Sequence, residues 1–595
     1  MTKRIILLLI IIISGSSLEA QNLPLVKART YETNIFNDGG TKDIAWDRNS
    51  KRLFSINESL NRLEVYDMAD ITKPFRMKLV DLSSYISAPK SIAAFNGIIA
   101  VVGIGSSAQS SGKVLFFDND GNFENQFSVG PLPDMVDFAP GGNILLIANE
   151  GSPTNDYSSD PAGSVSIINV SVGVNNLSQA SVNTVSFTPL DSQAINPLVL
   201  HYGNNDQQLV SQDLEPEHIT ANSNATKAYV SLQENNAMMI IDIQSASIDT
   251  VIGLGYLDRG IAGNGLDASD LNTAIDIKTF NRLFGIFQPD AIVSFEFNGS
   301  TYIASANEGE PIVTSNFSDV SRLNSTPIDP GKFTNVGSLI NDNNLGRLEV
   351  NSRLGDNNGD GLKDSLFTFG TRSFSIWDDK FQLIWDSGDE FEQIIAMAFP
   401  LQFNSDNDDN NSFKSRSDNR GPEPTALTIG EVDGTRYAFI GMERMGGFMV
   451  YDISDPTNPQ FELYELNRDF SKQANSSGAG DLGLESIVFV PSFQSPTGIA
   501  LLIVANEVSG TFSIYEIGQG IGLEEKDAQF LKAFPNPSTG NFNLEQYGNY
   551  KVFNSVGKLI LDKVNVNSID LSEEMQGLYI IKDEEGNVCR ILKKN

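Results

Sequence analysis

Residues 215–242 read EPEHITANSNATKAYVSLQENNAMMIID, and this stretch decides the fold. An acidic residue opens a short apolar segment, and a turn separates it from a second apolar segment that ends near Glu234. A polar turn and a third apolar segment, which ends at Asp242, complete the unit. Short apolar runs separated by turn residues predict antiparallel strands joined by hairpins.

The same order recurs along the whole chain. Four further clear copies and two weaker ones begin at Leu132, Gln288, Glu423, Leu484, Lys42 and Pro89. β-Rich units that recur about every 40 to 60 residues predict a β-propeller, in which each unit is one four-stranded blade. One blade cannot bury its own apolar face, so the units must close into a ring. The copies therefore predict an all-β protein with a seven-bladed propeller over residues 21–518.

Composition narrows the function. The 595 residues carry 41 Lys and Arg against 75 Asp and Glu, which gives a net charge of −34. Such a chain repels nucleic-acid phosphates, so we expect no nucleic-acid partner. The acidic excess is compatible with divalent cations, and it also suits a soluble secreted protein. A single cysteine (Cys589) and two histidines (His201 and His218) exclude cysteine-ligated and three-histidine zinc centres.

The N-terminus is predicted to direct export. Lys3 and Arg4 precede an apolar run over residues 5–13, and small residues lead to Ala20. This pattern predicts a secretory signal peptide over residues 1–20, which is too short to span a bilayer. No later segment is apolar over a sufficient length, so we expect no transmembrane span.

Residues 530–595 form a different module, after a predicted linker at 519–529. Their eight basic and eight acidic residues balance, so the acidic excess belongs to the propeller. They contain FPNPSTG at 534–540, VGK at 556–558, GLYII at 577–581 and a terminal Lys-Lys pair. This tail resembles the type A C-terminal sorting domain of the Bacteroidetes type IX secretion system. The resemblance implies a small β-sandwich that the type IX machinery handles and removes, which leaves the protein secreted or on the outer-membrane surface of a Gram-negative bacterium. A carbohydrate-binding sandwich is the alternative.

The propeller also resembles a known family. The matching strings are ANEG at 148–151, EPE at 215–217, LQENN at 232–236, RSFSIWD at 372–378 and DSGDEFE at 386–392. These resemble the choice-of-anchor I family over nearly all of residues 25–517. Relatives are labelled alkaline phosphatase or are similar to mesenchyme-specific cell-surface glycoproteins. The resemblance implies a propeller exposed outside the cell.

The repeat places acidic residues at two equivalent points of each blade. Strand A lies nearest the channel and strand B runs antiparallel to it, so the start of A and the end of B meet at one end of the ring. Acids at these two points are Asp43, Asp134, Glu217, Asp290 and Glu485 for strand A, and Glu58, Glu150, Glu234, Glu308, Glu443 and Glu507 for strand B. We therefore expect a funnel mouth lined by carboxylates, interrupted by Lys90 and Thr425.

Carboxylates this close raise one another's pKa unless a cation neutralises them. Oxygen ligands favour a hard divalent ion, and calcium is the predicted cofactor. The expected ligands are Glu150, Glu217, Glu234, Glu308, Glu485 and Glu507. Two alternatives stay open: the ion supports the fold without catalysis, or each glutamate hydrogen-bonds backbone amides and staples neighbouring blades.

A second cation signal lies in DNNGDGLKD at 356–364. Asp356, Asn358 and Asp360 stand at alternate positions before Gly361, as in the first half of a calcium loop. Phe367 stands at the twelfth position, where an EF-hand has an acid, so this is not an EF-hand. We expect a calcium ligand set here, with a solvated turn as the alternative.

Phosphate-ester chemistry needs cationic groups, and Arg372, Arg416, Arg420 and Arg444 lie near the acidic points in sequence. The predicted catalytic residues are Glu217, Glu234, Glu308 and Arg372. We expect a metal-dependent phosphoric ester hydrolase that acts on a small phosphate monoester. A non-enzymatic module for surface binding or adhesion is the alternative.

Overall fold

The computed structural model describes residues 23–36, 39–518, 531–536, 538–554, 558–584 and 588–594. The predicted signal peptide and linker lie outside these residues, as do Pro537, Val556 and Gly557 of the tail motifs. The described residues form two compact units, one over 23–518 and one over 531–594.

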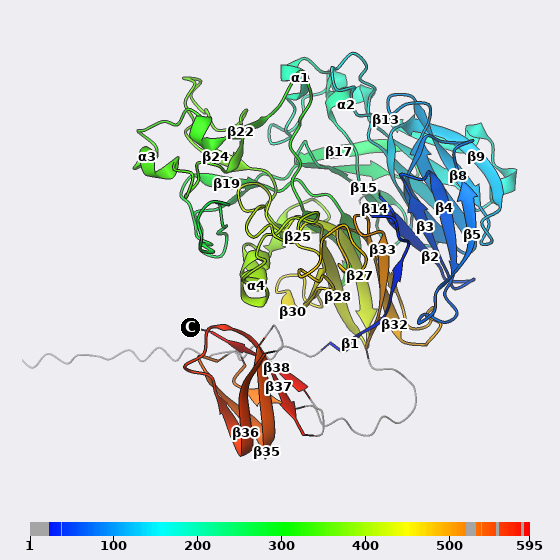
Figure 1. Cartoon of the computed structure of the whole chain (residues 1–595). Coiled ribbons are helices and arrows are strands. Elements are labelled where there is room, and N and C mark those ends of the chain that lie inside the picture. The colour runs from blue at the N-terminus through cyan, green and yellow to red at the C-terminus, as the bar shows by residue number, and fades with distance from the viewer. Residues whose placement is uncertain are drawn as a thin grey trace, which may run out of the picture. The chain divides into compact units, whose positions relative to one another are not determined.

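The first unit is a ring of antiparallel sheets (Figure 1). Among the described residues, seven sheets have four strands each. The first sheet consists of β2 (Asp43–Asp47), β3 (Arg52–Asn57), β4 (Arg62–Asp67) and β5 (Phe75–Asp81). The second consists of β6 (Ala88–Phe95), β7 (Ile98–Ile104), β8 (Ser111–Phe117) and β9 (Phe123–Pro131). The third consists of β10 (Pro133–Phe138), β11 (Ile144–Asn149), β12 (Ser164–Asn169) and β13 (Val182–Ser186). These are blades 1 to 3.

Blades 4 to 6 continue in chain order. They are β14 (Ile219–Ala221), β15 (Lys227–Leu232), β16 (Ala237–Asp242) and β17 (Ser247–Gly253); β20 (Ile292–Phe297), β21 (Ser300–Asn307), β25 (Ser373–Asp378) and β26 (Leu383–Asp386); and β27 (Pro424–Val432), β28 (Thr435–Met442), β29 (Phe448–Asp452) and β30 (Gln460–Glu465).

The last blade joins the two ends of the propeller. It combines β31 (Leu484–Val490), β32 (Ala500–Asn506) and β33 (Thr511–Ile517) with β1 (Leu25–Glu32) from the N-terminus. β1 pairs antiparallel with β33, with Leu25 opposite Ile517 and Glu32 opposite Thr511. Figure 1 shows the blue first blade beside the orange last one. The ring is therefore closed by backbone hydrogen bonds between its two ends.

The core lies between blades. One apolar cluster joins Phe54 and Leu63 of blade 1 to Val101 and Leu115 of blade 2, and comparable clusters occupy the other blade interfaces. Because both faces of each sheet are covered, every residue of β32 (ALLIVAN) is buried, whereas the outer strand β5 alternates between exposed and half-buried residues. The innermost strands β2, β6, β10, β14, β20, β27 and β31 contact one another in series, and β31 contacts β2. The predicted all-β propeller is confirmed.

Long connections decorate the ring. The segment before blade 4 holds η1 (Val174–Asn176), η2 (Gln179–Ser181), η3 (Thr188–Ser192), α1 (Gly203–Asp206) and α2 (Val210–Asp213). The segments around blade 5 hold β18 (Tyr256–Asp258), β19 (Leu283–Ile286), β22 (Val320–Arg322), η4 (Leu323–Ser325), α3 (Val336–Leu339), β23 (Glu349–Asn351), β24 (Leu366–Thr368) and α4 (Glu390–Ala398). β18, β19 and β24 form a three-stranded sheet, and β22 pairs with β23.

The second unit is a small all-β domain. Its strands are β34 (Ala533–Phe534), β35 (Asn541–Asn554), β36 (Leu559–Asp570), β37 (Gly577–Asp583) and β38 (Val588–Lys593), in the order β34-β35-β37-β38 with β36 paired to β35. Phe542, Val552, Ile569 and Ile581 pack in its core. Within the described residues, no helix has both the length and the apolar character needed to cross a membrane.

Candidate cation site at the funnel mouth

The strand ends bring acids from different blades to one end of the ring, which we call the funnel mouth. Glu58, Glu150, Glu308, Glu443 and Glu507 each directly follow the second strand of a blade, and Glu234 follows β15 by two residues. In blade 3, Pro133 pairs with Asn149, so Asp134 and Glu150 lie at the same end of their sheet. Leu484 pairs with Asn506 in the same way in blade 7.

β-Bulges aim several strand-A side chains toward the mouth. The register slips by one residue between Pro133 and Met135, between Leu484 and Ser486, and between Pro89 and Ser91. The extra residue is charged in each case: Asp134, Glu485 and Lys90. A bulge leaves its extra residue outside the ladder and turns its side chain, which explains why these positions escape strict alternation.

A buried asparagine fixes the end of strand B in several blades. The Asn149 side chain donates to the Ser164 carbonyl at 3.2 Å and to Ser166 Oγ at 3.1 Å. Asn307 donates to Ser375 Oγ at 2.7 Å in blade 5. These bonds hold the strand end, so the following Glu150 or Glu308 is presented from a rigid position.

Lysines neutralise one part of the mouth. Lys42 Nζ lies 3.3 Å from Glu507 and 3.9 Å from Glu485, and Lys90 Nζ lies 2.7 Å from Glu58. Glu485 raises the pKa of Lys42 well above its usual value, and Glu507 adds to this against the opposing effect of burial. Lys42 was not expected at the mouth from the sequence, although it directly precedes the strand-A position of blade 1.

Three arginines neutralise the next part. Arg420 and Arg444 approach the fully buried Glu423 at 3.2 and 3.0 Å, and Arg416 also contacts it. Burial alone would raise the pKa of Glu423, but the three guanidinium groups outweigh it and lower that pKa. Together with the two lysines these groups define the arginine–lysine side of the mouth.

A carboxylate trio lies within this arginine–lysine side. Oxygen atoms of Glu308, Glu423 and Glu443 lie within 4.8 Å of one another, a spacing that suits a metal ion. Arg444 Nη1 is 3.3 Å from Glu443, and Arg420 Nη1 is 4.0 Å from Glu308. Among the described residues, no other three acids meet this spacing. The arginines already supply positive charge there, so the trio has the better spacing for an ion but the weaker need for its charge.

The carboxylate-rich side of the mouth consists of Glu150, Glu215, Glu217 and Glu234. Among the described residues, no Lys, Arg or His nitrogen lies within 4.0 Å of these four carboxylates. Glu217 Oε2 and Glu234 Oε2 are buried and have no hydrogen-bond partner. Ser152 Oγ contacts both Glu150 and, at 3.3 Å, Glu215.

The pKa values on this side reflect burial and mutual repulsion. Burial raises the pKa of Glu217 well above its usual value, and the Glu234 and Asp290 charges raise it further. Burial and the Glu150 charge do the same for Glu234. Burial, with the Asp134 charge, raises the pKa of Glu150 to about 8. Each carboxylate is therefore short of positive charge.

Other strand-A acids serve as staples. Asp43 accepts hydrogen bonds from Ser91 Oγ at 2.9 Å, Ile92 N at 2.9 Å and Ser486 Oγ at 2.7 Å. These donors belong to blades 2 and 7, so Asp43 ties blade 1 to both neighbours. Thr425, which interrupts the acidic pattern, donates to Asp290 of blade 5.

Arg372 lies at the same end of blade 5 as Glu308, because Ser373 pairs with Asn307, but its hydrogen bonds reach other residues. It is 2% exposed, and it donates to the carbonyls of Asp267 and Ser417 and to Glu392 Oε1 at 2.7 Å. A fourth bond reaches the carbonyl of Asn419. Four hydrogen bonds from its guanidinium therefore hold these connections together. Asp356, Asn358 and Asp360 lie in the blade 5 insertion between β23 and β24.

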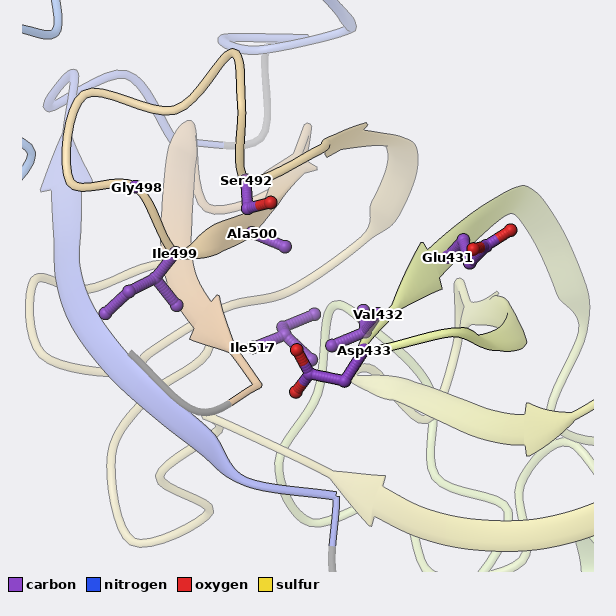
Figure 2. A pocket seen from close by; sticks show the side chains of 8 residues that line it. All are labelled: Glu431, Val432, Asp433, Ser492, Gly498, Ile499, Ala500 and Ile517. Atoms are coloured by element: carbon purple, nitrogen blue, oxygen red, sulfur yellow. The ribbon is translucent and has the colours of Figure 1, made fainter. Parts of the chain in front are cut away.

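Two surface pockets lie outside the mouth. The one in Figure 2 sits at the opposite end of blades 6 and 7, where Val432 ends β27 and Ala500 begins β32. Its free volume is about 60 Å³, too little for a ligand site of the usual 300–1,000 Å³. A larger pocket of about 420 Å³ lies between η3 and β17, lined by Pro189, Gln193 and Asp249 among others.

Comparisons with known proteins agree with the architecture. Residues 42–456 match the family model of the choice-of-anchor I domain, and residues 532–594 match that of the secretion system C-terminal sorting domain. The second match shows that the type IX machinery handles this chain, which is secreted or attached to the outer-membrane surface with cleavage of the tail.

Two curated relatives and one solved structure are similar. Gigasin-3a of Magallana gigas is 33% identical over 194 residues, which cover 31% of this chain and 68% of the relative. The mesenchyme-specific cell surface glycoprotein of Strongylocentrotus purpuratus is 28% identical over 281 residues, covering 41% of this chain and only 35% of its own length. Hydrazine synthase of Kuenenia stuttgartiensis is 13% identical, with a TM-score of 0.41, and covers 81% of this chain and 97% of its own.

Proposed function

The chain belongs to the choice-of-anchor I family, and from this premise we propose that its propeller binds calcium on the carboxylate-rich side of the funnel mouth. We propose further that the bound ion supports hydrolysis of a small phosphate monoester outside the cell. The first step concerns the ion and the second concerns the reaction, and each has its own test.

One observation carries the proposal for the ion. Glu217 Oε2 and Glu234 Oε2 are buried without a hydrogen-bond partner. A buried carboxylate oxygen without a donor is costly, and natural proteins pair such groups or use them to coordinate metals. The charges that act most strongly on Glu217 are other carboxylates, so a bound cation would relieve both desolvation and repulsion.

The donor set favours calcium. Glu150, Glu215, Glu217 and Glu234 offer only carboxylate oxygens, and Ser152 adds a hydroxyl beside two of them. Calcium accepts six to eight oxygen ligands in flexible geometry, whereas zinc prefers nitrogen and sulfur. Glu308, Glu485 and Glu507 are less suited as ligands, because Arg420 or Lys42 already lies within 4.0 Å of each of them.

The two sides of the mouth could act together on a phosphate ester, with the arginines near its phosphate oxygens and the cation polarising the ester. On the arginine–lysine side, Arg420 and Arg444 keep 13% and 23% of their side chains exposed and offer positive charge to phosphate oxygens. On the carboxylate-rich side, calcium would polarise the ester.

Calorimetric calcium titration of the metal-free protein tests the ion. Glu217→Gln and Glu234→Gln keep side-chain size and remove charge, so each should weaken binding roughly tenfold or more. Glu431→Gln is the matched control, because Glu431 is exposed at the opposite end of blade 6. Unchanged affinity in both mouth variants would remove this site from consideration.

Hydrolysis of p-nitrophenyl phosphate, with and without chelator, tests the reaction. Activity that needs calcium, and that falls in Glu234→Gln but not in Glu431→Gln, is the expected result. Calcium binding without any hydrolysis would favour the non-enzymatic surface-binding module. The pocket of about 420 Å³ between blades 3 and 4 supports that second candidate, since its size suits a small surface ligand.

A further inference from the structure

The blade 5 insertion contains a second cluster of oxygen ligands, far in sequence from the mouth residues. The loop at 356–364 connects β23 to β24. It belongs to a subdomain with its own apolar core, in which Leu323, Ile328, Phe333 and Leu366 pack together.

Backbone amides hold the loop in a tight coil. Asp356 accepts from the Gly359 and Gly361 amides, both at 2.8 Å, and Asn358 Oδ1 accepts from the Asp360 amide at 2.9 Å. Asp360 Oδ1 accepts from the Leu362 amide at 2.9 Å. Gly361 has a φ of 86°, the left-handed conformation that glycine tolerates best. These bonds shape the loop, but they do not by themselves indicate a ligand.

Asp364 supplies an independent indication. Its side chain is only 4% exposed, and its Oδ2 accepts from the Asn357 amide at 2.9 Å, so the carboxylate lies against the loop. Its Oδ1 is buried and has no hydrogen-bond partner. The adjacent Lys363 forms no ion pair with Asp364 in the described structure; its Nζ donates to the Ser352 carbonyl at 2.8 Å, and its charge acts on Asp356. The site therefore contains a buried carboxylate oxygen without a donor, which a cation could satisfy.

We propose that residues 356–364 bind one calcium ion, and that Asp364 is the ligand that completes the set. Asp356, Asn358 and Asp360 occupy the first, third and fifth positions of a calcium loop, and the Leu362 carbonyl occupies the seventh. Asp364 occupies the ninth position, which in such loops often reaches the ion through a water molecule. This agrees with the described structure, in which the oxygens of Asp356, Asp360 and Asp364 do not all lie within 4.8 Å of one another. The set has three carboxylates and two neutral oxygens, which suits calcium better than the rigid octahedron of magnesium.

The ion's role follows from what Asp364 is attached to. Its backbone amide donates to the Gly355 carbonyl at 2.7 Å, and its carbonyl accepts from Arg282 Nη1 at 3.3 Å. Arg282 in turn accepts from the Leu366 amide, where β24 begins to pair with β19. Calcium would thus fasten the exposed loop to the β19–β24 ladder and hold the insertion in place.

Calcium titration of the full secreted chain, with calcium alone as the probe, tests this site separately from the mouth. Asp360→Asn is the first variant, because Asp360 is exposed and an Asn side chain can keep the bond from the Leu362 amide. Asp378→Asn is the matched control, since Asp378 also accepts from backbone amides of a turn, at Lys380 and Gln382. In Asp360→Asn, one of the bound calcium ions should be lost or should bind at least tenfold more weakly. Glu234→Gln and Asp378→Asn should still bind that ion with wild-type affinity.

Limited proteolysis gives the second measurement. Wild-type protein should be cut within residues 352–366 in chelator and protected by calcium, and Asp360→Asn should be cut in both conditions. The Asp364→Asn variant should melt within a few degrees of wild type in chelator, and calcium should raise its melting temperature only by the part that the funnel mouth contributes. Equal calcium stoichiometry in wild type and Asp360→Asn would overturn the site. So would an Asp364→Asn melting temperature lowered by the same amount with and without calcium, which indicates a structural aspartate only.

Discussion

The two sides of the funnel mouth differ in whether the chain itself supplies positive charge to their buried carboxylates. On the arginine–lysine side, Glu423 is fully buried yet contacts three guanidinium groups, and its pKa is lowered. On the carboxylate-rich side, Glu217 is also buried but lies among other carboxylates, and its pKa is raised well above the usual value. The same residue type is therefore neutralised on one side of the mouth and left uncompensated on the other.

This difference teaches where an external cation belongs. A buried ion pair is complete once its partner is part of the chain, so a metal there would compete with arginine. A buried carboxylate without a partner depends on protonation or on an ion from solution. The acidic residues of the individual blades predict that carboxylates are distributed evenly around the mouth. The cationic side chains lie on one side only, so they divide the mouth into two electrostatically different sides.

The largest effect is expected from removing a built-in cation. Arg420→Met keeps much of the side-chain volume but leaves Glu308, Glu310 and Glu423 short of positive charge. Removing one partner of a buried ion pair costs about 3–5 kcal/mol of unfolding free energy. Urea unfolding should show this loss, while Glu217→Gln in metal-free protein should be neutral or stabilising. Equal losses in the two variants would erase the distinction between the sides.

The next effect concerns calcium and the carboxylate-rich side. Calcium at about 100 times its Kd should add roughly 2.7 kcal/mol to the unfolding free energy, because it binds only the folded state. Thermal melts of wild type should rise by several degrees, and those of a Glu217→Gln, Glu234→Gln double variant should retain only the rise contributed by the blade 5 loop. A double variant with the full wild-type rise would contradict calcium binding at the mouth.

The next effect is a pH dependence to which raised carboxylate pKa values on both sides contribute. Carboxylates whose folded pKa is raised hold protons that the unfolded chain has already lost, so the metal-free protein should lose stability as pH rises from 5 to 8. Glu150 contributes through its pKa of about 8 and Glu443 through one of about 7. Glu150→Gln should reduce the loss of unfolding free energy between pH 5 and 8 by on the order of 2 kcal/mol. Stability in chelator that rises with pH would reverse the expected sign.

Much of this molecule could be predicted from its sequence, because the features concerned depend on residues that are close together in the chain. Repeated apolar runs and hairpin turns identified the propeller, and the tail motifs identified the sorting domain; both are confirmed. The positions of the acidic residues at strand ends could be predicted, because Glu150 and Glu308 directly follow Asn149 and Asn307, each of which ends a buried strand. Such positions depend on hairpin geometry within one blade.

The compensation of charge could not be predicted, because it depends on contacts between distant segments. Arg420 comes from the long connection after α4 and reaches Glu308 of the preceding blade. Arg372 was expected as a substrate clamp, but the fold buries it against carbonyls from residues 267, 417 and 419. Asp364 was not among the expected calcium ligands, since its burial arises only when β24 pairs with β19.

The smallest effect is expected at Lys90, where the two sides meet. Lys90 pairs with Glu58 at 2.7 Å and also lowers the pKa of Asp134 and Glu150, in each case against the larger effect of burial. Both side chains of the pair are partly exposed, at 21% and 29%, so water screens it and Lys90→Met should cost only about 0.5–1 kcal/mol in chelator. The variant leaves Glu150 with less positive charge nearby, so its calcium affinity should increase while its unfolding free energy falls slightly. Lys73→Met is the control, because Lys73 is 83% exposed on a turn and pairs only with Asp70. Calcium affinity that falls in Lys90→Met would mean that Lys90 supports the cation site, and the boundary between the two sides would then lie elsewhere.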